Sequence, residues 1–260
     1  MRTLQKLLRK GNPAFGSWIN SASPIVAELM ASSGFDFLTV DVEHSAVELP
    51  QVQQLFQAIR AGNPRCAPLV RVSGCNYSAI KRFMDAGAVG IICPLVNTPE
   101  EARELVAAVK YPPEGRRGVG FCRDNDYGVK LGERVAKANR ETLVCVQIEH
   151  VEGVKNIDAI LSVPGVDVAF IGPYDLTASM GVTAQFDSPK YLSAKRKVLE
   201  ACRRHRVVAG IHIVQPEPAQ VRKAIREGYR FIAYSLDITM LTHACSDGLK
   251  KIKGESRPNT

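Results

Sequence analysis

The sequence predicts an α/β protein folded as a (β/α)₈ barrel, or TIM barrel, and three observations support this fold class. Short apolar runs alternate with stretches of helical character along the 260 residues. These runs are mostly continuous, as expected of parallel strands that are buried on both faces. About eight such runs favour a closed barrel over an open, doubly wound sheet. Four of them follow a glycine that can end a helix in a left-handed conformation, namely Gly34, Gly87, Gly165 and Gly228.

Eight strands are expected, separated by helices. In chain order they are residues 15–19, 35–41, 67–72, 88–94, 143–149, 166–172, 207–213 and 229–235. Residues 1–16 have the pattern of a short amphipathic helix and a turn. They lack the apolar core and small-residue cleavage site of a signal peptide.

The helices are predicted from start signals and apolar stripes. Ser23 followed by Pro24 is typical of a helix start, and Thr98 with Glu101 three residues later forms a capping-box pattern. Residues 49–59 carry an apolar stripe at helical spacing, which indicates a helix that faces the core. Residues 116–139 are polar and poorly periodic, so we expect a long loop and an extra helix there.

No composition shift or flexible linker divides the chain. We therefore expect a single domain, with the barrel over residues 1–253 and a disordered tail over residues 254–260. No run approaches the roughly 18 apolar residues that a membrane helix needs. The seven cysteines are odd in number and never spaced C-x-x-C, which favours reduced thiols, a cytoplasmic location and no zinc site.

The charge balance is basic: 34 basic and 26 acidic residues give a net charge of +8. Basic clusters at residues 195–197, 203–206 and 250–251 can form a phosphate-binding patch, or simply solvated helix faces. The second reading is favoured, because no aromatic residues interleave the clusters to stack on bases. We expect neither a nucleic-acid nor a membrane partner.

Candidate catalytic groups follow from the fold, because such barrels carry them at the carboxyl ends of their strands. Glu149 and Asp175 lie at the ends of consecutive strands. A carboxylate pair with open positions suits Mg²⁺ or Mn²⁺, which prefer oxygen ligands. The alternative is that each carboxylate caps a helix or pairs with a basic residue. His44 is either a general base or a loop histidine, and Arg71 holds either an oxyanion or a structural ion pair.

Two absences narrow the chemistry further. None of the expected strands contains a lysine, which argues against a Schiff-base aldolase. No G-x-G-x-x-G or P-loop motif is present, so a nucleotide cofactor has no support. Any chemistry at the carboxyl ends of these strands is therefore expected to depend on a metal ion.

Taken together, these motifs resemble the HpcH/HpaI family of metal-dependent (class II) pyruvate aldolases. The similarity extends from about residue 4 to residue 249, in order and with the spacing of the family. It rests on Gly16-Ser17-Trp18, Asp41-Val42-Glu43-His44, Val70-Arg71-Val72, Gln147-Ile148-Glu149 and Ile171-Gly172-Pro173-Tyr174-Asp175.

The resemblance implies a (β/α)₈ barrel assembled as a homohexamer that exchanges C-terminal helices. It implies that Glu149 and Asp175 hold a divalent ion, Mg²⁺ or Mn²⁺ with Co²⁺ as a further candidate, which chelates pyruvate. Arg71 would stabilise the enolate oxygen, and His44 would transfer a proton through a metal-bound water. Asp85 matches an aspartate that reaches His44 from a neighbouring subunit.

Four further positions concern the substrate. Gln147 would orient the water or the substrate, while Gly172 and Pro173 would let backbone amides approach the pyruvate carboxylate. Residues 120–128 depart from the family pattern. In that stretch, Arg123 either binds the acidic or polyhydroxylated end of a longer substrate or orders the loop.

The expected reaction is reversible aldol cleavage of a 4-hydroxy-2-oxo acid to pyruvate and an aldehyde. One alternative is a citrate-synthase-like enzyme of a siderophore pathway, which joins oxaloacetate to acetyl-CoA on the same scaffold; His212 is a candidate mark of such a divergence. A second alternative is a non-catalytic barrel that binds a polyanion.

Overall fold

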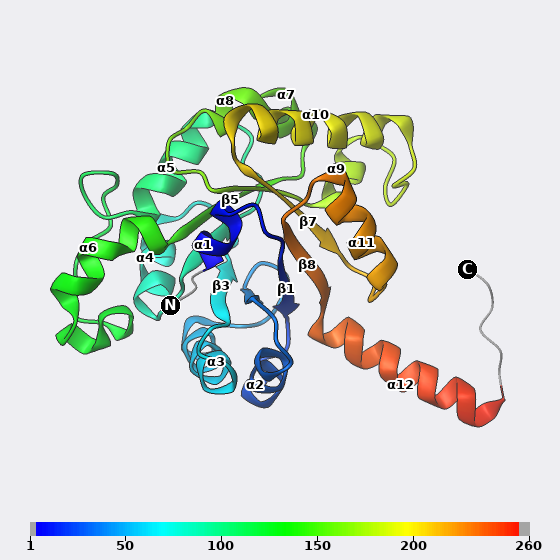
Figure 1. The fold of residues 1–260 in the computed structure, drawn as a ribbon, viewed down its shortest axis with the longest axis horizontal. Coiled ribbons are helices and arrows are strands. Elements are labelled where there is room, and N and C mark those ends of the chain that lie inside the picture. The colour runs from blue at the N-terminus through cyan, green and yellow to red at the C-terminus, as the bar shows by residue number, and fades with distance from the viewer. Residues whose placement is uncertain (1–3, 255–260) are drawn as a thin grey trace.

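A computed structural model describes residues 4–254 and confirms the predicted barrel (Figure 1). Eight parallel strands pair in the order β1 to β8, and β1 pairs with β8 to close the barrel. Most strands begin one or two residues later than predicted, because the chain leaves its turn before pairing starts. The strands are β1 (Ala14–Ile19), β2 (Phe37–Asp41), β3 (Ala67–Arg71), β4 (Gly90–Cys93), β5 (Leu143–Ile148), β6 (Val168–Ile171), β7 (Val208–Ile213) and β8 (Phe231–Leu236).

Helices surround the strands, and the predicted start signals operate as expected. Ser23 Oγ accepts the Val26 N–H, and Thr98 and Glu101 form the reciprocal capping box. The helices are α1 (Leu4–Arg9), α2 (Pro24–Ser32), α3 (Leu49–Gly62), α4 (Tyr77–Asp85), α5 (Pro99–Val109), η1 (Arg123–Gly128), α6 (Leu131–Glu141), α7 (Val151–Lys155), α8 (Ile157–Leu161), α9 (Pro173–Ser179), α10 (Pro189–His205), α11 (Pro218–Glu227) and α12 (Asp237–Lys253).

The barrel interior is a packed core of large apolar side chains. Phe37 and Phe231 stack with their ring centroids 4.1 Å apart, and Phe231 meets Phe170 edge to face. Gly16 leaves room for this stack, since a Cβ there would lie 2.2 Å from the Phe37 ring. Helix α1 packs its leucines against the same core. The predicted N-terminal helix therefore closes the amino end of the barrel and leaves the carboxyl end open.

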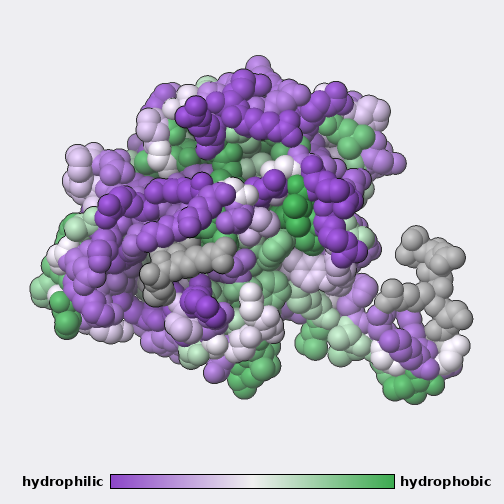
Figure 2. Space-filling model, viewed as in Figure 1, coloured by the Kyte–Doolittle hydropathy of each residue, from purple (hydrophilic) through white to green (hydrophobic). Residues whose placement is uncertain are grey.

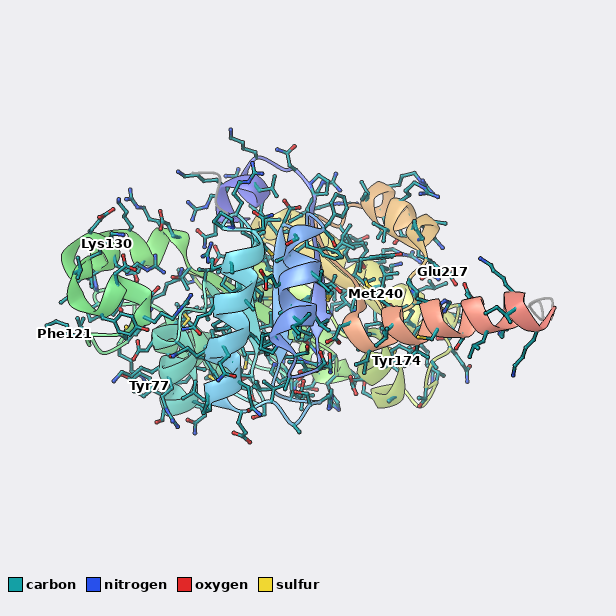
Figure 3. The ribbon with its side chains drawn as sticks, turned by 90° about the horizontal axis from the view of Figure 1, so that it is seen from below. Tyr77, Phe121, Lys130, Tyr174, Glu217 and Met240 are labelled. Atoms are coloured by element: carbon teal, nitrogen blue, oxygen red, sulfur yellow. The ribbon has the colours of Figure 1, made fainter. Side chains whose placement is uncertain are left out.

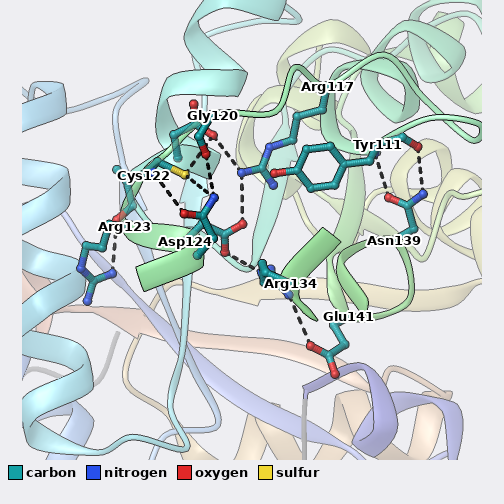
Figure 4. Close-up of polar contacts among 12 residues, drawn as sticks. Tyr111, Arg117, Gly120, Cys122, Arg123, Asp124, Arg134, Asn139 and Glu141 are labelled. Carbon is teal, nitrogen blue, oxygen red and sulfur yellow. Dashed lines mark hydrogen bonds and ion pairs between the residues drawn. The ribbon is translucent and has the colours of Figure 1, made fainter. Parts of the chain in front are cut away.

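Residues 116–139 form the predicted loop and extra helix, held by a buried arginine (Figure 4). Arg117 is fully buried and donates to Asp85 at 2.9 Å and to Asp124 at 3.1 Å. Its guanidinium lies 4.6 Å above the Tyr111 ring. Asn125 is also buried and donates to the Gly120 carbonyl at 2.7 Å, so this side chain orders the loop.

The C-terminal helix α12 leaves the barrel instead of packing along it, as Figures 1 and 3 show. Hydrophobic residues, including Ile238, Leu241 and Ile252, are exposed along it (Figure 2). Gly254 ends the helix with a φ of +72°. The expected tail over residues 254–260 otherwise lies outside the described residues. Among the helices of residues 4–254, none is long and apolar enough to cross a membrane.

Candidate functional site

A cavity of about 310 Å³ opens at the carboxyl end of the barrel. Its lining brings together residues that lie far apart in the sequence, on β1, β3, β5, β6 and β7, in the loops that follow β2 and β6, and in the first turn of α9. Six of the predicted site residues take part. They are His44, Arg71, Gln147, Gly172, Pro173 and Asp175.

Glu149, which follows β5 and is only 3% exposed, does not line the cavity itself but lies against two residues that do, Gln147 and Gly172. Its carboxylate accepts the Leu95 N–H at 2.8 Å and a hydrogen bond from Gln147 Nε2. Burial raises the pKa of Glu149 to about 7, and the charges of Asp175 and Glu43 act in the same direction. The raised pKa means that the protein neighbours of Glu149 stabilise its negative charge less well than water does. A cation beside the carboxylate would stabilise this charged form.

Asp175 lies in the first turn of α9, at the mouth of the cavity. The helix is capped by Gly172 without a side-chain bond, and Asp175 makes no hydrogen bond or ion pair among the described residues. Glu149 pairs with no basic side chain there either, and the following helix α7 is capped by His150. The alternative in which the two carboxylates serve as caps or ion-pair partners therefore has no support in the contacts.

Two observations fit a divalent ion between these carboxylates. The buried Gln147 Oε1 has no hydrogen-bond partner among the described residues, so the amide group that contacts Glu149 also carries an unsatisfied acceptor. A Cβ on Gly172 would lie 2.5 Å from Glu149 Oε2, so glycine keeps the space beside that oxygen open. The part of the chain that the structure describes holds no cluster of three or more ligating residues. Water and substrate oxygens would have to complete the coordination, as is usual for Mg²⁺.

Arg71 stands at the end of β3, fixed by two carboxylates. Its Nε and Nη2 donate to Asp41 at 2.9 and 2.7 Å, and Nη1 lies 3.1 Å from Glu43 Oε2. Burial raises the pKa of Asp41, but the charge and hydrogen bonds of Arg71 outweigh it and leave that pKa below its ordinary value. A guanidinium has five N–H donors. Arg71 is thus an ion-pair partner of two carboxylates, and it keeps further N–H groups that can donate to a ligand in the cavity.

His44 lies in the loop after β2 with its side chain 63% exposed. Its backbone N–H donates to Asp41 Oδ1 at 3.3 Å, which ties the loop to the same aspartate that holds Arg71. Its imidazole Nε2 lies 3.9 Å from Glu43 Oε2. The ring is open to the cavity and to solvent, rather than held in the loop by hydrogen bonds among the described residues.

Asp85 and Arg123 do not reach this cavity within their own chain. Asp85 ends α4 at the amino end of the barrel, where it accepts from Arg117. Arg123 Nη1 donates to the Ala86 carbonyl at 3.2 Å, at the same end. Within one chain, therefore, Arg123 contacts the turn between α4 and β4 rather than this cavity, and contact of either Arg123 or Asp85 with the cavity would require a second copy.

Two further cavity residues, Trp18 and His212, received no catalytic or binding role from the sequence, although His212 is a candidate mark of the citrate-synthase-like alternative. Trp18 lies with its ring centroid 4.4 Å from the Arg71 guanidinium and 5.3 Å from the His212 ring, which it stacks on at 19°. His212 Nε2 lies 3.1 Å from the Ser235 carbonyl, so this nitrogen carries the proton. Burial lowers the pKa of His212 to about 4, which keeps the ring neutral. The signal that could have found both residues is their place near the ends of β1 and β7.

Comparison with known proteins relates the chain to one family of aldolases and lyases. A family model described as HpcH/HpaI aldolase/citrate lyase matches residues 14–244. The chain is 36% identical to a hydroxypyruvate/pyruvate aldolase of Roseobacter denitrificans, over 93% of each chain. It is 34% identical to a 2-keto-3-deoxy-L-rhamnonate aldolase of Salmonella schwarzengrund, covering 97% of this chain and 94% of the other.

Solved structures give the same result for the fold. An HpcH/HpaI aldolase from Desulfitobacterium hafniense superimposes with a TM-score of 0.91 and 33% identity, over 99% of both chains. The citrate synthase SbnG superimposes with a TM-score of 0.87 and 27% identity, over 98% of both chains. The similarity therefore includes the whole barrel and the elements that carry the cavity.

Proposed function

The chain belongs to the HpcH/HpaI aldolase/citrate lyase family and is an aldolase, and from this premise we propose that it cleaves 4-hydroxy-2-oxo acids reversibly to pyruvate and an aldehyde. The observation that carries the proposal is the grouping of Glu149, Asp175 and Arg71 around one cavity. Two carboxylates and an arginine gathered at one site are suited to an oxo acid and to the enolate that forms from it.

Glu149 and Asp175 would hold the divalent ion, Mg²⁺ or Mn²⁺, with Co²⁺ as a third candidate. When bound, the ion supplies Lewis acidity that polarises the 2-oxo group of the substrate. Gln147 supports this arrangement by holding one Glu149 oxygen with its amide N–H, while its carbonyl oxygen remains available to a bound donor.

Arg71 would stabilise the negative charge that develops on the enolate oxygen. Its guanidinium is already oriented by Asp41 and by the face of Trp18, so little reorganisation is needed when charge forms. Gly172 and Pro173 line the same cavity, where a small residue would let the pyruvate carboxylate approach the start of α9. The amino end of a helix favours such an anion.

His44 would move the proton between the 4-hydroxyl group and bulk solvent. Its exposed imidazole at the mouth can exchange protons with water, and imidazole is the side chain best suited to proton transfer near neutral pH. Asp85 from a neighbouring copy would hold this ring, which one chain leaves without an orienting partner among the described residues.

The partners of this chain would be a 2-oxo acid, an aldehyde and further copies of itself in a homohexamer. Support for assembly comes from two apolar surfaces. Helix α12 projects from the barrel with exposed hydrophobic residues, and the outer face of α2 exposes Ile25 (71%) and Leu29 (63%). A helix exchanged between copies would cover both. The seven free thiols support a reducing, cytoplasmic location.

A second candidate function has one specific observation in its favour, the similarity to the citrate synthase SbnG. In that case the enzyme would join oxaloacetate to acetyl-CoA. The non-catalytic alternative is not retained, because the chain matches named aldolases over nearly its whole length.

One pair of assays separates the two enzyme functions. We expect the protein with Mg²⁺, pyruvate and a panel of aldehydes to form 4-hydroxy-2-oxo acids, and we expect EDTA to abolish the product. The same protein with oxaloacetate and acetyl-CoA should release no thiol. Thiol release without any aldol product would replace the aldolase proposal with the synthase.

A further inference from the structure

A second and larger hollow lies at the opposite end of the barrel from the candidate active site. Its volume is about 1160 Å³, and its lining includes Ala67, the first residue of β3, whereas Arg71 at the other end of that strand lines the active site. The hollow is bounded by α1, the end of α3, and the η1–α6 segment. We call it the basal hollow.

The basal hollow is strongly basic. Nine basic and four acidic residues line it, a net charge of +5, although the whole chain carries only +8. The side of the molecule that carries α1 and α6 is accordingly hydrophilic in Figure 2. The basic residues are Lys6, Arg9, Arg60, Arg65, Arg123, Lys130, Arg134, Lys137 and Arg140.

The four acidic residues of the lining already have partners. Asp124 and Glu141 both pair with Arg134, at 2.8 and 3.3 Å. Asp126 and Glu133 pair with lysines one helical turn further along the chain, at 2.5 and 2.6 Å. All four of these ion pairs lie within the η1–α6 segment, and none of the four carboxylates forms an ion pair with Arg60, Arg65 or Arg123.

Three arginines, Arg60, Arg65 and Arg123, have no carboxylate partner among the described residues. Arg60 Nη1 donates to the Pro64 carbonyl at 2.7 Å, and Arg123 Nη1 donates to the Ala86 carbonyl at 3.2 Å. A carbonyl orients a guanidinium without neutralising its charge. Burial lowers the pKa of Arg60, and the positive charges of Arg123 and Arg134 lower it further. Together they outweigh the opposite effects of Cys66 and Asp124.

The position of the Arg123 side chain also depends on a glycine in the neighbouring backbone. A Cβ on Gly87 would lie 2.2 Å from Arg123 Nη1, so the guanidinium rests in space that only glycine leaves free. Gly87 has a φ of +109°, a conformation that other residues rarely adopt. A half-buried arginine held beside other unneutralised arginines costs stability through like-charge repulsion.

We propose that the basal hollow is a binding site for a small polyvalent oxyanion, held by the guanidinium groups of Arg60, Arg65 and Arg123. Guanidinium groups bind phosphate and carboxylate oxygens through two parallel N–H donors, and several such forks select ligands with more than one negative charge. Phosphorylated metabolites and polycarboxylic acids share this chemistry. Within one chain the basal hollow is separate from the aldolase cavity, because the two lie at opposite ends of β3.

The proposal is tested by calorimetric titration of protein that has been freed of metal with EDTA and then dialysed into EDTA-free buffer of low ionic strength. Inorganic pyrophosphate and citrate are the probes, one for each source of the anion. We expect saturable binding of at least one probe, with one site per chain. The affinity should fall by about tenfold or more in Arg60→Gln, Arg65→Gln and Arg123→Gln, the loss of one charge-assisted fork. Arg65 is exposed and its side chain makes no hydrogen bond or ion pair among the described residues, so we expect its variant to fold as the parent does.

Two control variants distinguish this site from diffuse charge attraction and from binding in the aldolase cavity. Lys250→Gln on α12 removes the same charge far from the hollow, and Arg71→Gln alters the aldolase cavity; both should bind the probe as the parent does. Equal weakening by Lys250→Gln would show diffuse charge attraction only. Binding that is lost in Arg71→Gln but kept in the three hollow variants would place the anion in the aldolase cavity. Either result, or no saturable binding of either probe, would overturn the proposal.

Discussion

Asp41 and Arg71 face each other across β2 and β3 as register partners, and two parallel hydrogen bonds of 2.9 and 2.7 Å join their side chains. Strand pairing therefore sets the geometry of the site before any ligand arrives. The same aspartate accepts the backbone N–H groups of Glu43 and His44, so one buried carboxylate positions both the arginine and the loop with the histidine.

This relationship predicts the effect of Arg71→Lys. A lysine keeps the charge but cannot make the two-point contact with Asp41 while donating to the substrate. We expect kcat to fall by about 10²–10³-fold, the usual cost of losing a donor to a developing oxyanion. Steady-state kinetics with pyruvate and an aldehyde measure this, with circular dichroism to check the fold. A lysine variant with full activity would remove Arg71 from the mechanism.

The neutral ring of His212 predicts a pH dependence of stability. Its pKa is about 4 in the folded protein and 6.5 as an ordinary histidine, so the unfolded chain binds more protons between these values. The stability that the neutral ring confers is present above pH 6.5 and is lost as the pH falls toward 4, by up to about 3 kcal/mol.

Urea unfolding of the parent and of His212→Asn, each measured from about pH 7.5 down to about pH 4, tests this. Asparagine keeps a donor for the Ser235 carbonyl but does not titrate in this range. The free energy of unfolding of the parent should fall more steeply than that of the variant. Parallel curves would mean that the ring is not neutralised by its surroundings.

The barrel core predicts that Gly16→Ala is destabilising. The added Cβ would lie 2.2 Å from the Phe37 ring, which is itself stacked on Phe231 and has no free space to move into. We expect a loss of about 1–3 kcal/mol in the free energy of unfolding, the usual cost of overpacking.

A matched glycine provides the control for that measurement. Gly132 lies inside α6, and a Cβ added there would meet nothing within 4 Å, so alanine at this position should stabilise the protein by up to about 1 kcal/mol. Thermal or urea unfolding of both variants gives the comparison. Similar changes in the two variants would contradict the packing argument.

Assembly through α12 predicts that charge on its apolar face dissociates the protein. Leu241→Lys puts a charge on a side chain that is 63% exposed in one chain. The substitution should therefore change the stability of an isolated copy little, but it should weaken association strongly if this side chain is buried in an interface. Sedimentation velocity should show a smaller assembly for Leu241→Lys than for the parent, whereas Lys250→Gln on the same helix should match the parent. Unchanged sedimentation of Leu241→Lys would contradict a role for this face.

The sequence was informative where the pattern is local or set by topology. Continuous apolar runs located all eight strands, and the rule that barrels carry chemistry at strand ends placed Arg71, Gln147 and Asp175 at one cavity. The first residue of each strand was predicted less accurately, because apolar residues that follow a turn can come before the first hydrogen bond between neighbouring strands. The β2 strand, for example, begins at Phe37 and not at residue 35.

Other features depend on contacts that no local pattern encodes. Arg123 sits in an aperiodic stretch, so nothing in the sequence showed at which end of the barrel it lies. The neutral state of His212 depends on the Ser235 carbonyl, which comes from a different strand in an unusual conformation with a φ of +53°. The basal hollow combines residues from α1, α3 and α6, and its charge could be seen only after those elements had been brought together.

The proposed mechanism depends above all on the formation of a pyruvate enolate beside Glu149 and Asp175. Exchange of the pyruvate C3 protons in deuterated buffer tests it most directly, because it needs no knowledge of the aldehyde. With Mg²⁺ or Mn²⁺ we expect exchange that EDTA abolishes, and we expect none in Glu149→Gln with its fold intact by circular dichroism. Exchange that persists in EDTA and in Glu149→Gln, or no exchange with any divalent ion, would contradict this mechanism.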